Sequence, residues 1–308
     1  MPFLDCFASY LPARVVTNAE VAQEIGCDAE WIRRTSGIEQ RRYAAAEETV
    51  VDLAVAAGQR CLAAAGGRPI GLLLVASGSS TRVFPGPAAG VAHRLGLGTV
   101  PALDFAMPSA GGLIALALAS QLTSHHGDVL VVAAEKMSAV VKRTGTSPHV
   151  AALFGDGAGA CVVTDDRGAV RVVDSVLHSD GAFEEALQLG FSAPMQMDGR
   201  TVIMQASRKI PQVIDELLAR HAVPRDAVAT FLLHQANQNL TEQVAAAMGV
   251  PSGRFFSNVS RSGNTSSASL LIAAAEWSAA GGVERGAPVV LAAFGAGLHW
   301  GAMLLTGA

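Results

Sequence analysis

The sequence predicts a layered α/β fold, and three observations lead to that prediction. The chain has 308 residues, which is about two domain lengths at roughly 150 residues each. Half of the residues are hydrophobic and 16% are charged, so there is ample material for large cores and too little charge for a disordered chain. Short apolar runs alternate with Ala-rich runs along the whole chain, as strands alternate with helices in layered α/β proteins.

Five short apolar runs are the expected strands. Continuous apolar runs of this length are typical of strands that are buried on both faces of a parallel or mixed sheet. They span residues 71–77, 128–134, 158–164, 229–234 and 288–294. Five longer runs, most of them rich in Ala, are the expected helices. They span residues 48–65, 110–124, 206–221, 240–248 and 267–280.

The two halves of the chain are weakly similar to each other. In each half a loop of small residues precedes an apolar helix, SAGG before LIALALAS and GNTSS before ASLLIAAA. Each half then ends in a Gly-containing strand motif, FGDGAGACVV or FGAGLHWGAML. We therefore expect a duplicated unit, with halves at residues 1–165 and 166–308. Residues 181–200 are expected to form an insertion loop.

Composition and charge exclude several classes of function. The net charge is −4 and no basic run offsets it, which argues against a nucleic-acid partner. Two charge-free stretches, 105–127 and 286–308, are interrupted by Pro, Gly and polar residues, so we expect no membrane span. No signal peptide is apparent, and the four Cys are widely spaced without a CxxC pair. These features predict a reduced, cytoplasmic protein without a metal site.

Three polar residues could carry chemistry. Ser109 follows Pro108, so it is expected close to a helix N-terminus, where unpaired N–H groups favour developing negative charge. His234 ends an apolar strand, and Asn264 lies in a turn of small residues. Each alone could be structural, as an N-cap, a buried histidine or a turn residue. Together they lie at strand ends or helix starts, which gather at one crevice in α/β sheets.

Nine segments distributed along the chain resemble the β-ketoacyl-acyl carrier protein synthase III family of the thiolase superfamily. The segments are YLPARVVTNAE, DAEWIRRTSGIEQRR, EETVVDLAVAAG, STRVFPGPAA, LFGDGAGACVV, LHSDG, LHQAN, SGNTSSAS and FGAGLHWGAMLL. The resemblance implies a thiolase fold with duplicated α/β halves in a five-layer α-β-α-β-α arrangement, and a homodimer.

The resemblance also implies roles for individual residues. The family's catalytic set is Cys, His and Asn; His234 and Asn264 match the last two, while Ser109 stands at the Cys position. The oxyanion hole would consist of the backbone N–H groups of Ser109 and Ala296. Trp31 matches the family's tryptophan that stacks on the adenine of coenzyme A, and Phe84 matches a residue that reaches into the partner subunit's tunnel. Arg34 is a further expected substrate-binding residue. The shape of the tunnel is expected to depend on Phe84, Leu153, Phe154, Leu187, Leu189, Phe191 and Met204.

Two departures from the family concern recognition of the thioester carrier. Thr35 stands where the family has an arginine near the adenine of coenzyme A, with Arg33 and Arg34 displaced toward Trp31. The helix after HQAN has no basic residue for docking an acidic carrier protein, so Arg208 and Lys209 are the remaining candidates.

A serine at the nucleophile position changes the expected mechanism. A helix dipole and a nearby histidine can ionise a thiol, but not an aliphatic alcohol. Ser109 would therefore act only if His234 took its proton during attack, giving an acyl-oxygen ester. His234 and Asn264 would still stabilise the enolate formed when malonyl-carrier protein loses CO₂, as the resemblance implies.

These inferences predict an acyltransferase of the ketoacyl synthase III type. It would move an acyl group from a coenzyme A or carrier-protein thioester through Ser109, by decarboxylative condensation or direct transfer, in polyketide or other secondary metabolism. Coenzyme A or phosphopantetheine thioesters would be substrates, and no cofactor would be bound permanently. Alternatives are a catalytically silent accessory subunit of a ketosynthase heterodimer, and an engineered Cys-to-Ser variant. An α/β-hydrolase is disfavoured because no GxSxG is centred on Ser109.

Overall fold

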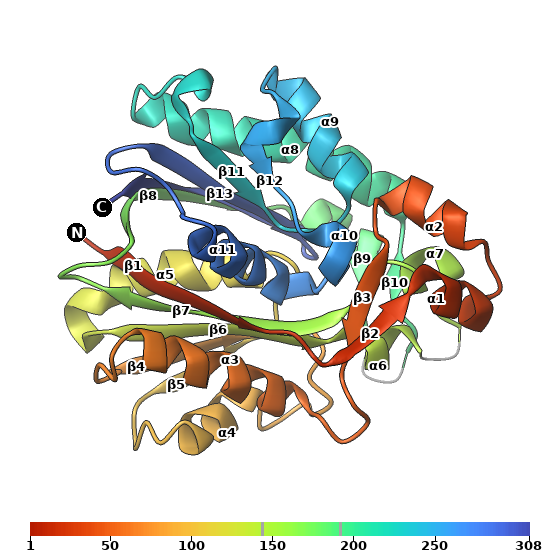
Figure 1. The fold of residues 1–308 in the computed structure, drawn as a ribbon, viewed down its shortest axis with the longest axis horizontal. Helices are drawn as coiled ribbons and strands as arrows, with labels where there is room; N and C mark the ends of the chain where they lie inside the picture. Colours follow the sequence, from red (N-terminus) through yellow and green to blue (C-terminus); the bar gives the residue numbers. More distant parts are fainter. Residues whose placement is uncertain (143–144, 191–192) are drawn as a thin grey trace.

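Ten strands form one mixed sheet in the order β12-β11-β13-β14-β8-β1-β7-β6-β4-β5 (Figure 1). The computed structural model describes residues 1–142, 145–190 and 193–308. The elements of the first half are β1 (Phe3–Tyr10), β2 (Arg14–Thr17), α1 (Asn18–Ile25), α2 (Ala29–Ser36), β3 (Gln40–Tyr43), α3 (Val50–Ala64), β4 (Leu72–Ala76), α4 (Pro87–Arg94), β5 (Ala102–Phe105), α5 (Gly111–His126), β6 (Val129–Lys136), α6 (Met137–Val141), α7 (Pro148–Ala151) and β7 (Asp156–Thr164).

The second half begins with β8. Its elements are β8 (Val170–Ser179), η1 (Gly181–Ala186), β9 (Leu187–Gln188), β10 (Gln196–Met197), α8 (Gly199–Arg220), η2 (Arg225–Ala227), β11 (Thr230–Leu233), α9 (Gln238–Met248), η3 (Ser252–Arg254), β12 (Phe255–Phe256), α10 (Val259–Ser262), η4 (Ser266–Ala268), α11 (Ser269–Ala279), β13 (Pro288–Gly295) and β14 (His299–Gly307).

The strand order reads symmetrically outward from the centre of the sheet. From β1 outward it runs β7, β6, β4, β5, and from β8 outward it runs β14, β13, β11, β12. The inner strands of each set pair antiparallel, whereas β4 is parallel to β5 and β6, and β11 is parallel to β12 and β13. Among the described strands, the two sets are joined by the pairing of Phe3 and Leu4 with Arg171 and Val170. Equivalent strands therefore occupy equivalent positions on the two sides.

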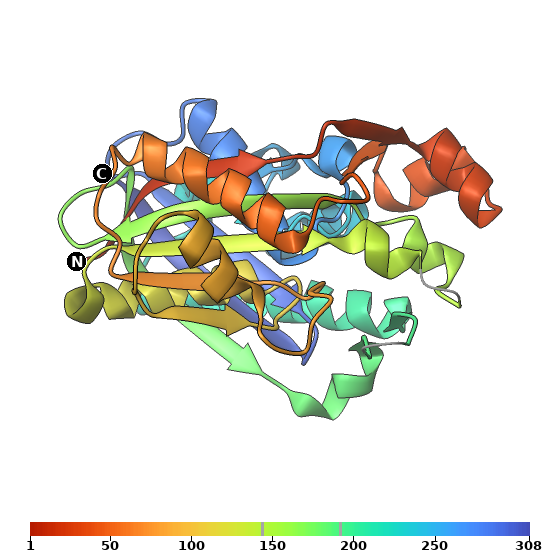
Figure 2. The same ribbon diagram turned by 90° about the horizontal axis from the view of Figure 1, so that it is seen from below.

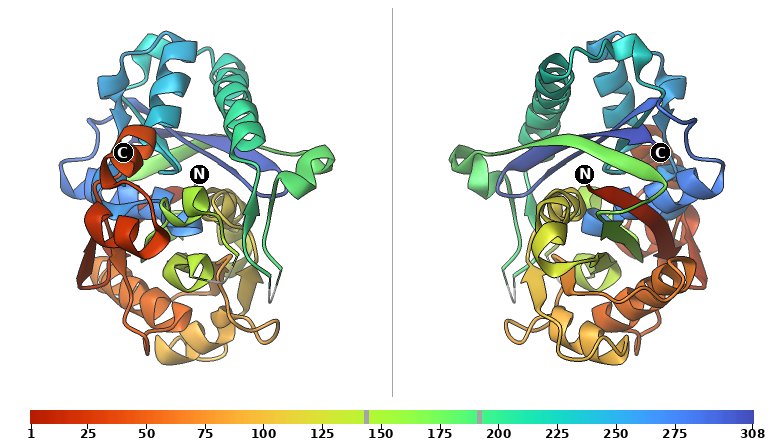
Figure 3. Two further views of the ribbon diagram at one scale, coloured as in Figure 1. Left: turned by 90° about the vertical axis from the view of Figure 1, so that its right-hand side faces the viewer. Right: turned by 90° about the vertical axis from the view of Figure 1, so that its left-hand side faces the viewer.

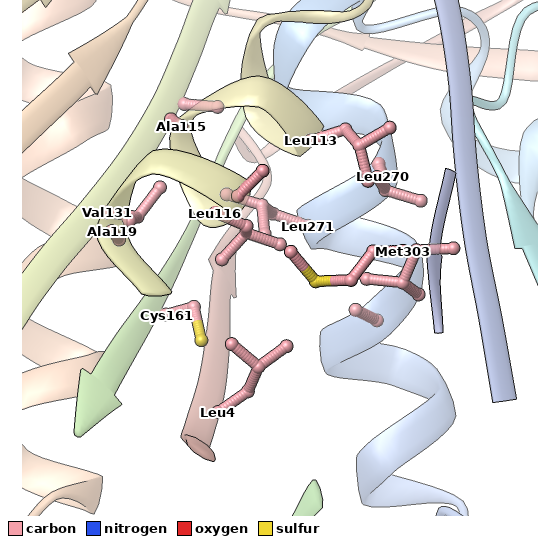
Figure 4. Close-up of a cluster of buried hydrophobic side chains, with 14 of the residues drawn as sticks. Leu4, Leu113, Ala115, Leu116, Ala119, Val131, Cys161, Leu270, Leu271 and Met303 are labelled. Carbon is pink, nitrogen blue, oxygen red and sulfur yellow. The ribbon is translucent and has the colours of Figure 1, made fainter. Parts of the chain in front are cut away.

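Two buried helices separate the two sets of strands. α5 packs on β4, β6 and β7 and also on β8, β13 and β14, while α11 packs on β1, β7 and β11. α3 covers the first set from outside and α8 covers the second, so the layers run α-β-α-β-α (Figure 3). Leu113 and Leu116 of α5 meet Leu270 and Leu271 of α11 in the central core (Figure 4). The predicted thiolase-type five-layer fold is confirmed.

Glycines in the FGDGAG motif allow the central layer to pack closely. A Cβ atom on Gly159 of β7 would lie 2.5 Å from the Leu271 Cβ and 2.8 Å from the Ile272 N atom of α11. No side chain larger than hydrogen fits between the strand and the helix backbone there. The motif therefore allows α11 to pack closely on β7, which positions the start of α11 and the preceding loop that contains Asn264.

Every expected strand and helix has a counterpart in the structure, but one boundary was wrong. α8 begins at Gly199, seven residues before the expected start, because the Asp198 carboxylate accepts hydrogen bonds from the Arg200 and Thr201 N–H groups and caps the helix. The expected insertion loop is partly structured, since it contains η1 and the paired strands β9 and β10. Figure 2 shows η1 at the end of β8, projecting beyond the layers.

Across the described ranges, no helix is both long enough and apolar enough to cross a bilayer.

Candidate active site

Ser109 lies in a tight turn between β5 and α5. Its φ of 64° is in the left-handed region, and the Ala110 N–H donates to the Pro108 carbonyl over 2.7 Å. Left-handed backbone is unfavourable for a residue with a Cβ atom, so surrounding structure must hold the turn. Gly295, at the end of β13, provides part of that support because the turn packs directly on its Cα. The side chain of Ser109 is presented two residues before α5 begins.

His234 follows the last residue of β11. Its N–H donates to the Ala292 carbonyl over 2.8 Å, which extends the pairing of β11 with β13 by one residue. The ring is buried, and its Nδ1 atom lies 2.5 Å from the Ser269 Oγ atom at the start of α11. Burial lowers the pKa of His234 from 6.5 to about 4. The imidazole is therefore neutral at neutral pH.

Asn264 is placed by a short bridge between the FGDGAG and GNTSS loops. Its N–H donates to the Leu153 carbonyl, and its carbonyl accepts from the Gly155 N–H, both over 3.0 Å. The side-chain Oδ1 atom accepts the Ser266 N–H over 2.8 Å. This bond fixes the orientation of the amide, and within the described residues its Nδ2 group has no hydrogen-bond partner.

Ser109, His234 and Asn264 line one cavity. This cavity of about 90 Å³, which we call the outer part, also touches α8, the start of α9 and the end of β13. A second cavity of about 40 Å³, which we call the inner part, is also lined by Ser109 but not by His234 or Asn264. Both parts share Ser109, Phe154 and Leu187, and most of their other walls are apolar side chains. The outer cavity is lined by Leu153, Met197, Gly199, Val202, Ile203, Ala206, Ile210, Ala236, Asn237, Leu240, Phe294 and Gly295. Ser109, His234 and Asn264 are thus, with Asn237, the polar residues in the wall of a mostly apolar cavity.

The backbone groups expected to form an oxyanion hole lie at the inner cavity. Ala296 lines it together with Ser109 and Ser266. The Ser109 N–H is engaged, because it donates to the Ser266 Oγ atom over 3.1 Å. Within the described residues, Ser109 Oγ and His234 share the cavity without a direct hydrogen bond. Contacts of this kind often tighten only when substrate is present.

The other predicted tunnel residues divide into two groups. Phe154 and Leu187 line both parts of the cavity, and Leu153 and Leu189 each line one part. Met204 does not line either part, because helical spacing turns Val202, Ile203 and Ala206 toward the tunnel and leaves Met204 48% exposed. Phe84 lies outside this chain's cavity and is 84% exposed. Phe191 lies outside the described residues.

Trp31 and Arg34 lie on α2, away from the three polar residues. The Trp31 ring meets the His149 ring edge-on, with 4.8 Å between centroids. Arg34 is exposed, and its carbonyl accepts the Asn239 side chain, which ties α2 to α9. Lys209 is not a free cation, because it pairs with Asp180 over 3.0 Å and lies 3.8 Å from the Trp300 ring centroid. Arg208 remains exposed on α8.

Sequence reasoning missed three residues that surround the site. Ser266 binds the Ser109 N–H, Ser269 binds the His234 ring, and Glu135 binds the Ser267 N–H and hydroxyl. The serine-rich GNTSSAS segment was the available signal, since serines at a helix start commonly satisfy backbone or side-chain partners. Glu135 gave no signal, because it is a single acidic residue near the end of the apolar strand β6 and belongs to no motif.

Comparison with known proteins identifies matching families and folds. Residues 103–181 match the family described as 3-oxoacyl-[acyl-carrier-protein (ACP)] synthase III, and residues 218–306 match its C-terminal family. The chain is 36% identical over 321 residues to the β-ketoacyl-[acyl-carrier-protein] synthase III of Oleidesulfovibrio alaskensis, covering 97% of each. The crystal structure of the synthase III from Aquifex aeolicus matches with a TM-score of 0.92 and 32% identity, covering 99% of this chain and 100% of that one.

A polyketide enzyme is also similar. The priming β-ketosynthase of the R1128 polyketide pathway matches with a TM-score of 0.90 and 30% identity, covering 100% of this chain and 96% of that one. The fold and the tunnel place this protein in the thiolase superfamily. The chain belongs, more narrowly, to the β-ketoacyl-[acyl-carrier-protein] synthase III family.

Proposed function

We propose that this protein is an acyltransferase that carries an acyl group on Ser109. The donor would be a coenzyme A or carrier-protein thioester, as in the chemistry named for its relatives. The observation that carries the proposal is the convergence of Ser109, His234 and Asn264 on one apolar tunnel. Each comes from a different loop, and each is buried. A tunnel of this kind excludes water from an ester intermediate, which supports transfer over hydrolysis.

Acylation of Ser109 requires a base. The hydroxyl attacks the thioester carbonyl while Nε2 of His234 takes its proton; the carbon–sulfur bond breaks, and the leaving thiolate receives that proton as a thiol. A neutral histidine is needed, and the low pKa of His234, caused by its burial, supplies it. The Ser109 N–H would exchange its bond to Ser266 Oγ for one to the carbonyl oxygen.

The inner cavity supports a short acyl group. A water molecule needs about 10–15 Å³ of such space, so about 40 Å³ holds roughly three groups of that size. Met137, Leu189 and Met195 are among the side chains that line this cavity. An acyl chain of roughly two to four carbons fits this volume. Longer chains would require these side chains to move.

Two acceptors are compatible with the site. In decarboxylative condensation, His234 and Asn264 donate hydrogen bonds to the enolate oxygen as malonyl-carrier protein loses CO₂, and the carbanion then displaces Ser109 from its ester. In direct transfer, a hydroxyl or amine attacks the ester instead. The likeness to a priming ketosynthase supports condensation and a place in polyketide metabolism. Trp31 and Arg34 at the α2–α9 contact would meet the carrier of the thioester, with Arg208 as a further cation.

We also propose that the protein functions as a homodimer. β5 is an edge strand of the sheet, and its Leu103 is 48% exposed. Val83 and Phe84, in the loop after β4, are 64% and 84% exposed. An unpaired edge with large apolar side chains beside it favours pairing with a second copy. Sedimentation equilibrium of the wild type and of Leu103→Lys tests this, with a dimer expected to dissociate in the variant.

A second candidate function is a silent accessory subunit. It is favoured by the engaged Ser109 N–H and by the lack of a direct hydrogen bond between Ser109 Oγ and the described His234 ring. In this case Ser109 would only shape a tunnel. An engineered replacement of the family's Cys would give the same geometry.

Intact-protein mass spectrometry distinguishes these possibilities. The protein is incubated with acetyl-, malonyl-, butyryl- and longer acyl-coenzyme A, alongside Ser109→Ala and Ser109→Cys. Ser120→Ala, which removes a buried hydroxyl from α5 away from the tunnel, is the matched control. A mass increase in the wild type and control but not in Ser109→Ala supports the acyl-serine. An adduct only in Ser109→Cys would favour the accessory or engineered alternative.

A further inference from the structure

The Ser269 hydroxyl has two hydrogen-bond partners within the described residues. The Gln235 N–H donates to the Ser269 Oγ atom over 3.0 Å. The His234 Nδ1 atom lies 2.5 Å from the same oxygen. Ser269 is buried at the first position of α11, and His234 and Gln235 follow β11. The contact therefore joins the strand end that carries His234 to the start of a central helix.

The direction of the second hydrogen bond follows from counting protons. A hydroxyl has one hydrogen to donate. The oxygen has two lone pairs and could accept from both partners, but its own hydrogen would then be buried without an acceptor. Within the described residues the His234 Nδ1 atom is the one acceptor in reach of the Ser269 hydroxyl, so the hydroxyl donates to Nδ1. A neutral imidazole that accepts at Nδ1 carries its own proton on Nε2. The His234 ring is neutral because burial lowers its pKa to about 4.

We propose that Ser269 is a positioning residue that holds His234 in the tautomer with the proton on Nε2. This inference rests on the proposed acyl transfer and deepens it. The Nε2–H and the Asn264 Nδ2–H are then two donors that face one tunnel. Both can stabilise negative charge on the oxygen of a bound malonyl thioester while its carboxylate leaves as CO₂.

The same tautomer disfavours the other half of the reaction. A protonated Nε2 has no lone pair for the Ser109 proton, so acylation must first move the ring proton to Nδ1. Ser269 therefore has opposite effects on the two half-reactions, raising the rate of decarboxylation and lowering that of acylation. A residue that only supported the fold would change both in the same direction.

Substitutions at Ser269 test this opposition. Ser269→Ala removes the donor to Nδ1, and Ser269→Asp offers a carboxylate that accepts the Nδ1–H and favours a bare Nε2. Ser269→Thr keeps the hydroxyl. Ser120→Ala is the matched control, because it deletes a buried hydroxyl from the other central helix, where Ser120 Oγ donates to the Ala117 carbonyl over 2.7 Å.

Two rates are measured for each variant. One is CO₂ release from malonyl-coenzyme A, and the other is the mass increase of the protein with acetyl-coenzyme A. We expect Ser269→Ala to slow decarboxylation about tenfold, the effect of one hydrogen bond, without slowing acylation. Ser269→Asp should lose decarboxylation and acylate faster, and Ser269→Thr and Ser120→Ala should match the wild type. Equal losses of both rates in Ser269→Ala would overturn the proposal.

Nitrogen-15 spectra of the eight histidines separate this proposal from the proposed function. His234→Asn assigns the His234 signals. The wild type should show a protonated Nε2 and an unprotonated Nδ1, and Ser269→Asp the reverse. A protonated Nδ1 in the wild type would refute the role of Ser269 whatever the activity. A wild type with neither half-reaction would refute the proposed function, and the spectra would still decide the tautomer.

Discussion

The turns before α5 and α11 each contain a serine with a left-handed backbone, and the two serine side chains have different roles. Ser109 has a φ of 64° two residues before α5, and Ser266 has a φ of 49° three residues before α11. The Ser109 hydroxyl faces both parts of the tunnel, whereas the Ser266 hydroxyl accepts the Ser109 N–H. Ser266 in turn gives its own N–H to Asn264. One half of the molecule presents the proposed nucleophile, and the other half binds its backbone N–H.

The two turns are also anchored differently, each on a strand of the opposite half. Ser267 donates its N–H and hydroxyl to the buried Glu135 carboxylate near the end of β6. The Ser109 turn instead packs on Gly295 at the end of β13, the strand in the equivalent position of the other set. Hydrogen bonds to the Glu135 carboxylate hold the turn before α11, which we call the supporting turn. Close packing on Gly295 holds the turn before α5, which we call the reactive turn. Within the described residues the Ser109 hydroxyl has no hydrogen-bond partner, as the proposed nucleophile requires.

Gly295→Ala should have the largest effect on acylation and stability, because it disrupts the packing of the Ser109 turn on β13. A Cβ atom there would lie 2.8 Å from the Ala110 N atom and closer still to the Pro108 carbonyl. These are backbone atoms, so the turn itself must shift. We expect more than a 100-fold loss of Ser109 acylation and a decrease of about 3 kcal/mol in the free energy of unfolding. Acylation kinetics by mass spectrometry and urea unfolding measure the two effects.

Gly90→Ala is the matched control for this substitution. Its added Cβ would find only the Val51 side chain, at 3.8 Å, which is an ordinary contact. It should leave the rate of acylation unchanged and alter the free energy of unfolding by no more than about 0.5 kcal/mol, as surface substitutions usually do. Normal acylation in Gly295→Ala would mean that the anchor of the reactive turn lies elsewhere.

Acidification should destabilise the half that carries His234. β4 and β11 occupy equivalent positions in the two sets of strands, and they are followed by Ser77 and His234. Of these two residues, only the histidine changes its charge with pH. The folded pKa of His234 is about 4, against 6.5 ordinarily. Between these values the unfolded chain binds a proton that the folded chain does not, so stability is complete above pH 6.5 and falls as the pH drops toward 4. The loss from this group reaches about 3 kcal/mol.

Urea unfolding of the wild type and of His234→Gln at pH 7, 5.5 and 4.5 measures this loss. Carboxylates titrate in both proteins, so the difference between them isolates the histidine. The wild type should lose the extra stability as the pH falls, and the variant should not. If the unfolding free energies of the two proteins changed in parallel with pH, burial would not lower the pKa of His234.

Glu135→Gln tests the charged anchor of the supporting turn and should have a smaller effect. The carboxylate accepts from the Gly78 N–H, the Ser79 hydroxyl and both donors of Ser267. An amide keeps one acceptor oxygen and turns its NH₂ group toward donors, leaving at least one buried donor unpaired. We expect a loss of about 2 kcal/mol in urea unfolding. Glu276→Gln, which breaks a surface pair with Arg261, is the control and should cost less than about 1 kcal/mol.

The alternation of strands and helices, and the position of three polar residues at strand ends or helix starts, could be predicted because both depend on local patterns. The five-layer arrangement was predicted from the resemblance to the synthase III family. Buried strands such as β6 appear as continuous apolar runs, and the HQAN and GNTSS motifs mark strand and helix ends. β1 and β8 were missed because their apolar residues are interrupted by charges such as Asp5 and Asp174. The Ser269 contact and the Glu135 network could not be predicted, since they join residues 35 and 132 positions apart.

Ser266→Ala should have the smallest effect and decides how far the two serines depend on each other. The substitution removes the acceptor of the Ser109 N–H, a bond of 3.1 Å in a buried turn. We expect a loss of about 1 kcal/mol in the free energy of unfolding, the net value of one hydrogen bond. Acylation of Ser109 should not fall, because the freed N–H becomes available to the carbonyl oxygen of the thioester. Urea unfolding and acylation kinetics are compared with those of Ser120→Ala. A large loss of acylation with little loss of stability would instead make the Ser266 hydroxyl part of the reaction, and the division between a reactive and a supporting turn would be wrong.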